Sequence, residues 1–287
     1  MSECSGESMG RPADQAERAE RFTIIVEVVP PAGPDAEKVL CELMRLSDLP
    51  VDRFSVATNP VAKPRMSAMA LCALIQQRTG RPATLHCTTR DHNRLSLQGE
   101  LWGARALGID TVMVATGDLV ADKYRNTTSD VRDLGVYDLV AMARECGLST
   151  GVVFDAHPEV CGLLRAVGHL QRKVEAGAQF VVTQPVYDTG GGLELFHATR
   201  HIGIPIILGI LPLRTLRHAQ FLHEKVAGIA VPEAVRERMR AADDSVAEGI
   251  ANARQMLAFA RNHFAGVCLM PPFDHYEVMH DILRDCH

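Results

Sequence analysis

The sequence predicts a single-domain α/β protein with a (β/α)8 barrel of the TIM type. Short runs rich in β-branched residues alternate along the chain with longer segments of helical periodicity, which is typical of parallel strands joined by crossover helices. Eight such runs are present, the number that closes a barrel of roughly 250 residues. An open doubly wound sheet is the structural alternative, but no Gly-x-Gly-x-x-Gly turn follows any of the runs.

The eight runs have the length of strands that are buried on both faces. They are residues 23–30, 53–58, 83–88, 111–116, 150–156, 180–184, 205–211 and 266–270. Between the fifth and sixth runs, residues 159–178 keep the period of an amphipathic helix, and Gly177 fits its C-terminal cap. Residues 232–264 indicate two helices before the last strand, which we interpret as an addition to the barrel.

Composition places the chain among folded globular proteins. We expect the catalytic domain to cover residues 21–287 and residues 1–20 to form a disordered tail. The chain is 47% hydrophobic and its net charge is −5, with Lys and Arg scattered among Asp and Glu, so no basic face for nucleic acid or for a membrane surface is expected. Its apolar runs are much shorter than a membrane span and its N-terminus lacks a signal-peptide core, which predicts a cytoplasmic protein.

One carboxylate, Glu27, interrupts the apolar first strand in the stretch TIIVEVVPP (23–31). An unpaired carboxylate buried in such a strand would be driven to neutralise through a raised pKa. Side-chain alternation puts Ile25, Glu27 and Val29 on one face, and the active site of a parallel barrel collects at the C-terminal ends of its strands. Glu27 is therefore predicted to point into the barrel mouth and to have a function there.

Polar residues end five successive predicted strands, which solubility alone does not explain. They are Thr58 and Asn59, then His86, Thr88, Arg90 and Asp91, then TGD (116–118), then DAHPE (155–159), and then Thr183 and Gln184. Each has a simpler interpretation, since Asp118 could cap a helix and His86 could be a satisfied core histidine.

No metal site is predicted, because His197 and His201 lack a third ligand. The glycines at 190–192 are predicted to form a loop.

An ordered set of short motifs resembles the 5,10-methylenetetrahydrofolate reductase family over nearly all of residues 22–286. The motifs are VEVVPP (26–31), HCTTRDHNRLSLQGELWGARALGI (86–109), TGD (116–118), HPE (157–159), LQRKVEAGAQFVVTQPVYD (170–188), GILP (209–212) and MPPF (270–273). Each motif is weak alone, and their order makes the set specific.

The resemblance implies a (β/α)8 flavoenzyme with FAD across the barrel mouth. In that family the flavin is reduced by NADH or NADPH and reoxidised by methylenetetrahydrofolate, which becomes methyltetrahydrofolate for methionine supply. The reduced folate would be the substrate, and a homo-oligomer is possible. Control by S-adenosylmethionine is not expected, because the resemblance places it in a further C-terminal domain and this sequence ends at residue 287.

The resemblance also implies roles for individual residues. Glu27 matches the general acid that opens the five-membered ring of the folate, Asp118 matches an acid near flavin and folate, and Gln184 matches a folate-contacting amide. The residues implied in cofactor binding are Thr58, His86, Thr116, Gly117, Asp118, His157, Arg172 and Lys173. Arg172 and Lys173 would meet the cofactor's phosphates.

Two alternatives stay open. Residues 58–67 differ from the Tyr-Gly-Ala-Gly-like turn of many family members, and Leu216 stands where an aromatic is often found. A divergent member could therefore bind flavin or pterin but take electrons from a partner protein, or serve a methyltransferase complex as a non-catalytic subunit. An unrelated barrel lyase that uses Glu27 and Lys173 on a phosphorylated substrate is the second alternative.

Overall fold

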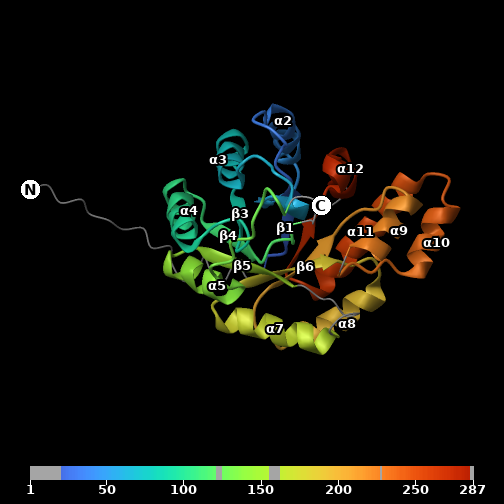
Figure 1. Cartoon of the computed structure of the whole chain (residues 1–287). Coiled ribbons are helices and arrows are strands. Elements are labelled where there is room, and N and C mark those ends of the chain that lie inside the picture. The colour runs from blue at the N-terminus through green and yellow to red at the C-terminus, as the bar shows by residue number, and fades with distance from the viewer. Residues whose placement is uncertain (1–20, 121–124, 155–161, 227, 285–287) are drawn as a thin grey trace, which may run out of the picture.

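Eight parallel strands close into a barrel in which each strand pairs with the next and β8 pairs with β1 (Figure 1). The computed structural model describes residues 21–120, 125–154, 162–226 and 228–284. The strands are β1 (Thr23–Val28), β2 (Arg53–Val56), β3 (Ala83–Thr88), β4 (Thr111–Ala115), β5 (Ser149–Phe154), β6 (Phe180–Pro185), β7 (Ile206–Ile210) and β8 (Gly266–Leu269). All eight predicted strands are confirmed, and so is the closed barrel.

Helices surround the barrel, as Figure 1 shows. They are α2 (Glu37–Leu46), α3 (Ala68–Thr79), α4 (Arg94–Ala106), α5 (Val136–Glu145), α7 (Leu163–Glu175), α8 (Thr189–Thr199), α9 (Leu216–Lys225), α10 (Glu233–Ala241), α11 (Ser245–His263) and α12 (Glu277–Leu283). Two short 3-10 turns, η1 (Pro60–Ala62) and η3 (Pro272–Asp274), follow β2 and β8. The two predicted helices before the last strand are confirmed as α10 and α11.

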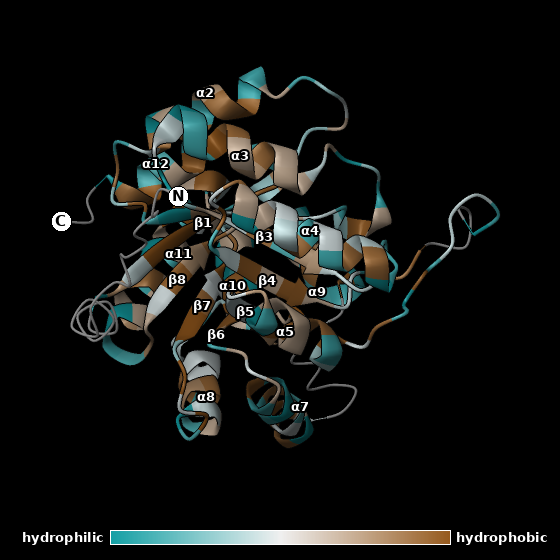
Figure 2. Cartoon of the chain, turned by 90° about the vertical axis from the view of Figure 1, so that its left-hand side faces the viewer, coloured by the Kyte–Doolittle hydropathy of each residue, from teal (hydrophilic) through white to brown (hydrophobic). Residues whose placement is uncertain are grey.

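The barrel wall buries side chains on both of its faces, as its mostly apolar strands in Figure 2 indicate. Val26 and Val28 of β1 are fully buried and belong to the core between the strands and the surrounding helices. Ile25 belongs to a separate apolar cluster with Met113, Val182, Ile207 and Cys268. Because Glu27 has the same parity as Ile25, the strand directs it inward, as predicted.

The structure corrects one loop prediction. The glycines at 190–192 lie in the first turn of α8, where Asp188 caps the helix by accepting a hydrogen bond from the Gly191 amide at 2.7 Å. A Cβ at Gly192 would come within 2.4 Å of the Phe259 ring, so a residue without a side chain lets α8 pack against α11. The run was misread because tertiary packing outweighed the low helix propensity of glycine.

The helices in the described part of the chain are too short or too polar to cross a bilayer. The predicted N-terminal tail and His157 both lie outside the described residues.

Candidate active site at the barrel mouth

A cavity of about 530 Å³ opens at the C-terminal ends of the strands. Its lining comes from β1 to β6, from β8 and from the loops that follow β2, β3, β4 and β8. Seven residues to which the family resemblance gave a role meet in this lining: Glu27, Thr58, His86, Thr116, Gly117, Asp118 and Gln184. Polar residues at the ends of β2, β3, β4 and β6 therefore share one site, as barrel geometry requires, while residues 155–159 after β5 lie outside the described residues.

Glu27 sits near the floor of the cavity, above the apolar cluster that fills the barrel. The cluster residue Ile25 lies one inward position below it, and Cys268 pairs with Ile25 on the neighbouring strand. Burial raises the pKa of Glu27 to about 7, and no hydrogen bond from the described residues offsets that effect. The carboxyl group can therefore be protonated near neutral pH and lose its proton to a bound molecule.

His86 of β3 forms a close pair with Ser55 of β2. Ser55 Oγ lies 2.7 Å from His86 Nε2, and both side chains line the cavity. Burial lowers the pKa of His86 to about 4, so the imidazole is neutral near pH 7. Thr58 Oγ1 donates a hydrogen bond to the His86 carbonyl at 2.5 Å, which joins the end of β2 to β3.

The turn after β4 presents Asp118 to the mouth. Gly117 takes the left-handed φ of 79°, and a Cβ there would lie 3.1 Å from side-chain atoms of Thr88 and Arg90. Both the backbone conformation and the close neighbours therefore favour glycine at this position. The Asp118 side chain is exposed, and its Oδ2 accepts a hydrogen bond from the Val61 amide at 2.6 Å.

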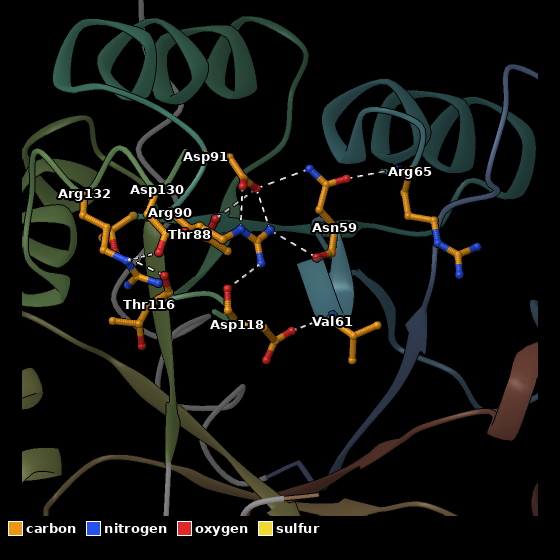
Figure 3. A network of polar contacts seen from close by, with 11 residues as sticks. Asn59, Val61, Arg65, Thr88, Arg90, Asp91, Thr116, Asp118, Asp130 and Arg132 are labelled. Carbon is orange, nitrogen blue, oxygen red and sulfur yellow. Dashed lines mark hydrogen bonds and ion pairs between the residues drawn. The ribbon is translucent and has the colours of Figure 1, made fainter. Parts of the chain in front are cut away.

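A buried arginine, Arg90, holds three mouth loops together (Figure 3). Only 1% of Arg90 is exposed, and it donates from Nε and Nη2 to both Asp91 carboxylate oxygens at 2.5 and 2.7 Å. Its Nη1 donates to the Asp118 carbonyl and its Nη2 to the Asn59 carbonyl, both at 3.1 Å. The loops after β2, β3 and β4 thus share one charged hub, which orders the side of the mouth that carries Asp118.

The turn after β2 is strained in the left-handed region. Asn59, Val61 and Ala62 have φ values of 43°, 50° and 53°. A β-branched residue such as Val61 rarely adopts this conformation, and such outliers concentrate at functional sites. Asp118 and Arg90 both hydrogen-bond to this turn, so they help to hold it in place.

Gln184 of β6 connects the mouth to a second cavity. It lines both the mouth cavity and a neighbouring space of about 300 Å³ beside α8, and none of the described residues hydrogen-bonds to its side-chain amide. An open amide with donors and an acceptor can bind a polar heterocycle.

The structure does not bring Arg172 and Lys173 to this lining. Arg172 is exposed on α7, where its guanidinium lies 5.2 Å from the Tyr137 ring centroid and its Nη2 lies 2.6 Å from His169 Nδ1. Lys173 is buried, and its Nζ donates a hydrogen bond to the Val153 carbonyl of β5 at 2.7 Å. A lyase that needs Lys173 beside Glu27 finds no support in this arrangement.

Two cavity residues, Ser55 and Cys268, had no place in the sequence interpretation. Each occupies an inward position, which strand alternation could have predicted, but its neighbours across the barrel could not be predicted from the sequence. Arg90 and Asp91 were noted only as polar strand ends, and their hub depends on loops that are distant in sequence.

Three arginines on loops at the mouth end keep one guanidinium nitrogen without a partner, although Arg132 Nε pairs with Asp130 at 3.4 Å and Arg65 Nη1 donates to the Pro30 carbonyl at 3.4 Å. Arg65, Arg132 and Arg214 lie on the loops after β2, β4 and β7. Each has a buried guanidinium nitrogen with no hydrogen-bond partner: Nε of Arg65, Nη2 of Arg132 and Nε of Arg214. Buried donors are normally satisfied, so three on one end of a barrel match a ligand that carries phosphates or carboxylates.

A model of the methylenetetrahydrofolate reductase family matches residues 13–267 of the chain. The chain belongs to the methylenetetrahydrofolate reductase family. The 5,10-methylenetetrahydrofolate reductase of Pectobacterium carotovorum subsp. carotovorum is 27% identical over 211 residues, which cover 71% of this chain and 69% of that protein. The Escherichia coli (strain K12) protein of the same name is 26% identical over 239 residues, 80% of this chain and 77% of its own length. Methylenetetrahydrofolate reductase 2 of Schizosaccharomyces pombe is longer, and the match spans 31% of it.

Solved structures share the barrel of this methylenetetrahydrofolate reductase family member. An uncharacterized protein from Clostridium thermocellum that binds two copies of 5-methyl-5,6,7,8-tetrahydrofolic acid superposes with a TM-score of 0.66 at 13% identity, over 94% of this chain and 95% of that chain. A mutant tryptophan synthase α-subunit from Pyrococcus furiosus gives a TM-score of 0.53 at 12% identity, over 91% and 98% of the two chains. These likenesses concern the fold.

Proposed function

We propose that the chain is a flavin-dependent enzyme that reduces 5,10-methylenetetrahydrofolate to 5-methyltetrahydrofolate with NADH or NADPH as the electron donor. The observation that carries the proposal is Glu27, a carboxyl group whose pKa burial raises to about 7, at the mouth of a barrel of this family. The reaction consumes one hydride and one proton, and Glu27 is suited to give the proton. Such an enzyme would supply methyl groups in one-carbon metabolism, for methionine synthesis.

Glu27 acts as the general acid in this proposal. Its O–H bond breaks as an N–H bond forms on the ring nitrogen of the folate, and the bond from that nitrogen to the methylene carbon breaks with its electron pair going to the nitrogen. The product of this step is a reactive iminium, which a hydride converts to the methyl group. A carboxyl group with a pKa near 7 has the best balance of proton availability and acidity at neutral pH.

Asp118 and Gln184 fit the binding of the polar pterin ring. They lie on the loop after β4 and on β6, and both line the cavity that Glu27 serves. The Gln184 amide has no hydrogen-bond partner among the described residues, so pairing with a substrate would remove no internal bond. The Asp118 carboxylate adds negative charge, which would stabilise a developing iminium.

The residues at the mouth also fit FAD. When bound, FAD supplies the hydride. Thr58, His86, Thr116 and Gly117 line the cavity and would contact the cofactor. Arg65, Arg132 and Arg214 lie on loops at the same end of the barrel, outside the cavity lining, and one nitrogen of each has no partner and would be available to the cofactor's phosphates. The predicted phosphate contacts of Arg172 and Lys173 remain a prediction, as does the cofactor role of His157.

The test is a visible absorption spectrum of the purified protein supplied with FAD, followed anaerobically by NADH or NADPH and then by methylenetetrahydrofolate. The proposal predicts flavin uptake, bleaching by the nicotinamide and recovery of colour with the folate. Bound flavin that neither nicotinamide bleaches, but that a reductase protein does, would support the partner-dependent alternative. No flavin uptake would contradict the proposal.

A further inference from the structure

Glu27, Ser55 and His86 occupy inward positions on three neighbouring strands. Glu27 of β1 pairs in register with Ser55 of β2, and both line the mouth cavity. Neighbouring strands lie about 4.8 Å apart, so the two side chains project side by side into the same space. Ser55 in turn lies 2.7 Å from Nε2 of His86 on β3. A carboxyl, a hydroxyl and an imidazole thus follow one another around the barrel.

His86 connects this row with a second opening. It lines the mouth cavity and also a separate cavity of about 270 Å³ beside α3 and α4, together with Thr58 and Thr88. None of the described residues hydrogen-bonds to its Nδ1. His86 therefore borders the mouth cavity and this side cavity at once.

We propose that Ser55 and His86 form a proton relay that returns a proton to Glu27 from the side cavity while a substrate covers the mouth. The inference rests on the proposed function, in which Glu27 loses one proton in each turnover and must regain it. A bound folate and cofactor would exclude water from the mouth, so Glu27 would need a proton from another direction.

The relay moves one proton without leaving a net charge on His86. Water in the side cavity gives a proton to Nδ1 as the Nε2 proton passes to Ser55 Oγ, and the Ser55 hydroxyl proton passes to the Glu27 carboxylate. One water molecule, or a rotation of the Glu27 side chain, closes the remaining gap. His86 ends as the opposite neutral tautomer and returns by exchange of both ring protons with the solvent. Ser55 is only 2% exposed, so its hydroxyl has few competing partners.

The experiment compares Ser55→Ala with the wild-type protein loaded with FAD. Rapid-reaction absorbance gives two rate constants, for flavin reduction by the nicotinamide and for reoxidation by methylenetetrahydrofolate. The relay predicts that the ratio of reoxidation to reduction falls at least fivefold in Ser55→Ala and that Ser55→Thr, which keeps the hydroxyl, restores most of it. Repeating both half-reactions in D2O should give a larger solvent isotope effect on reoxidation for Ser55→Ala than for the wild-type protein.

Thr150→Ala is the matched control, because it also removes a buried hydroxyl from a barrel strand. Thr150 is fully buried on β5 and donates to the Leu148 carbonyl, away from the cavity lining. It should leave the ratio unchanged. ¹⁵N NMR of His86 adds a readout that needs no cofactor, since loss of the Ser55 hydroxyl should shift the Nε2 resonance.

The outcomes separate the two proposals. A wild-type protein that reoxidises with folate, together with an unchanged ratio in Ser55→Ala, would overturn the relay alone. A shifted His86 resonance with an unchanged ratio would show that Ser55 only orients the imidazole, which also overturns the relay. A wild-type flavoprotein that never reoxidises with folate would overturn the proposed function.

Discussion

The Asp118 carboxylate accepts a hydrogen bond from the Val61 amide at 2.6 Å, which links the loop after β4 directly to the left-handed turn after β2. The two residues are far apart in sequence and meet only because β2, β3 and β4 lie side by side in the barrel. An acid expected near flavin and folate therefore also helps to shape the wall of the cavity.

Asp118→Ala should release the Val61 turn, whereas Asp118→Asn should hold it, because an amide oxygen can still accept the hydrogen bond. The cost in stability should be below about 1 kcal/mol, since the contact is exposed. Amide hydrogen exchange at Val61 is the measurement, and protection should fall only in the Ala variant. Equal protection in all three proteins would show that the contact does not hold the turn.

In the flavin assay, Asp118→Asn should slow both flavin reduction and flavin reoxidation. Unchanged rate constants would contradict the proposed place of Asp118 beside the flavin and the folate.

Arg90→Met should destabilise the protein by roughly 3 kcal/mol, because it leaves the partly buried Asp91 without its cation. Urea unfolding is the measurement. Arg45→Met is the matched control, since Arg45 makes a 2.9 Å ion pair with Glu42 on the surface of α2. That change should cost about 0.5 kcal/mol or less. A similar cost for both variants would contradict the view that Arg90 is the hub of the mouth loops.

Glu27 should make the folded state less stable as the pH rises. Below its ordinary pKa of 4.5 the carboxyl is protonated in both states, so it has no effect. Between 4.5 and about 7 the unfolded chain releases the proton while the folded state keeps it, and stability falls. Above 7 the loss is complete, on the order of 2 to 3 kcal/mol after allowance for partial exposure.

Glu27→Gln removes this effect, so its stability advantage over the wild-type protein should grow between pH 5 and pH 8. Urea unfolding of both proteins at several pH values gives the difference. His86, whose lowered pKa acts with the opposite sign, is present in both proteins and cancels. Glu145→Gln, a change on the exposed surface of α5, is the control and should give a flat difference. A flat difference for Glu27→Gln as well would mean that its carboxyl is not desolvated.

The barrel could be predicted from the sequence because the local pattern of strand and helix segments agrees with the global fold. Each strand is a short β-branched run between helical segments, and the parity of Ile25 and Glu27 already directs the acid inward. The sequence also predicted that Asp118 and Gln184 lie at one end of the barrel, because the C-terminal ends of all its parallel strands lie there. These are consequences of periodicity and chain direction, which a single sequence contains.

Contacts between separate loops were not readable. The pairing of Ser55 with His86, the Arg90 hub and the left-handed turn at Val61 depend on strand register and loop conformation. The position of Lys173 is a further example, because its helix was predicted but the reach of its side chain to the Val153 carbonyl was not. The first turn of α8 shows the same limit, since the close approach of Gly192 to Phe259 depends on how α8 packs against α11.

The most direct test of the account is the effect of Glu27→Gln on the two half-reactions of the FAD-loaded protein. Gln keeps the size of the side chain but cannot donate a proton as an acid. We expect that NADH or NADPH still bleaches the flavin at nearly the wild-type rate. The rate constant for reoxidation by methylenetetrahydrofolate should fall by at least a hundredfold, within the range expected for loss of a general acid. Equal loss of both half-reactions, or reoxidation at the wild-type rate, would contradict the role of Glu27 as the acid.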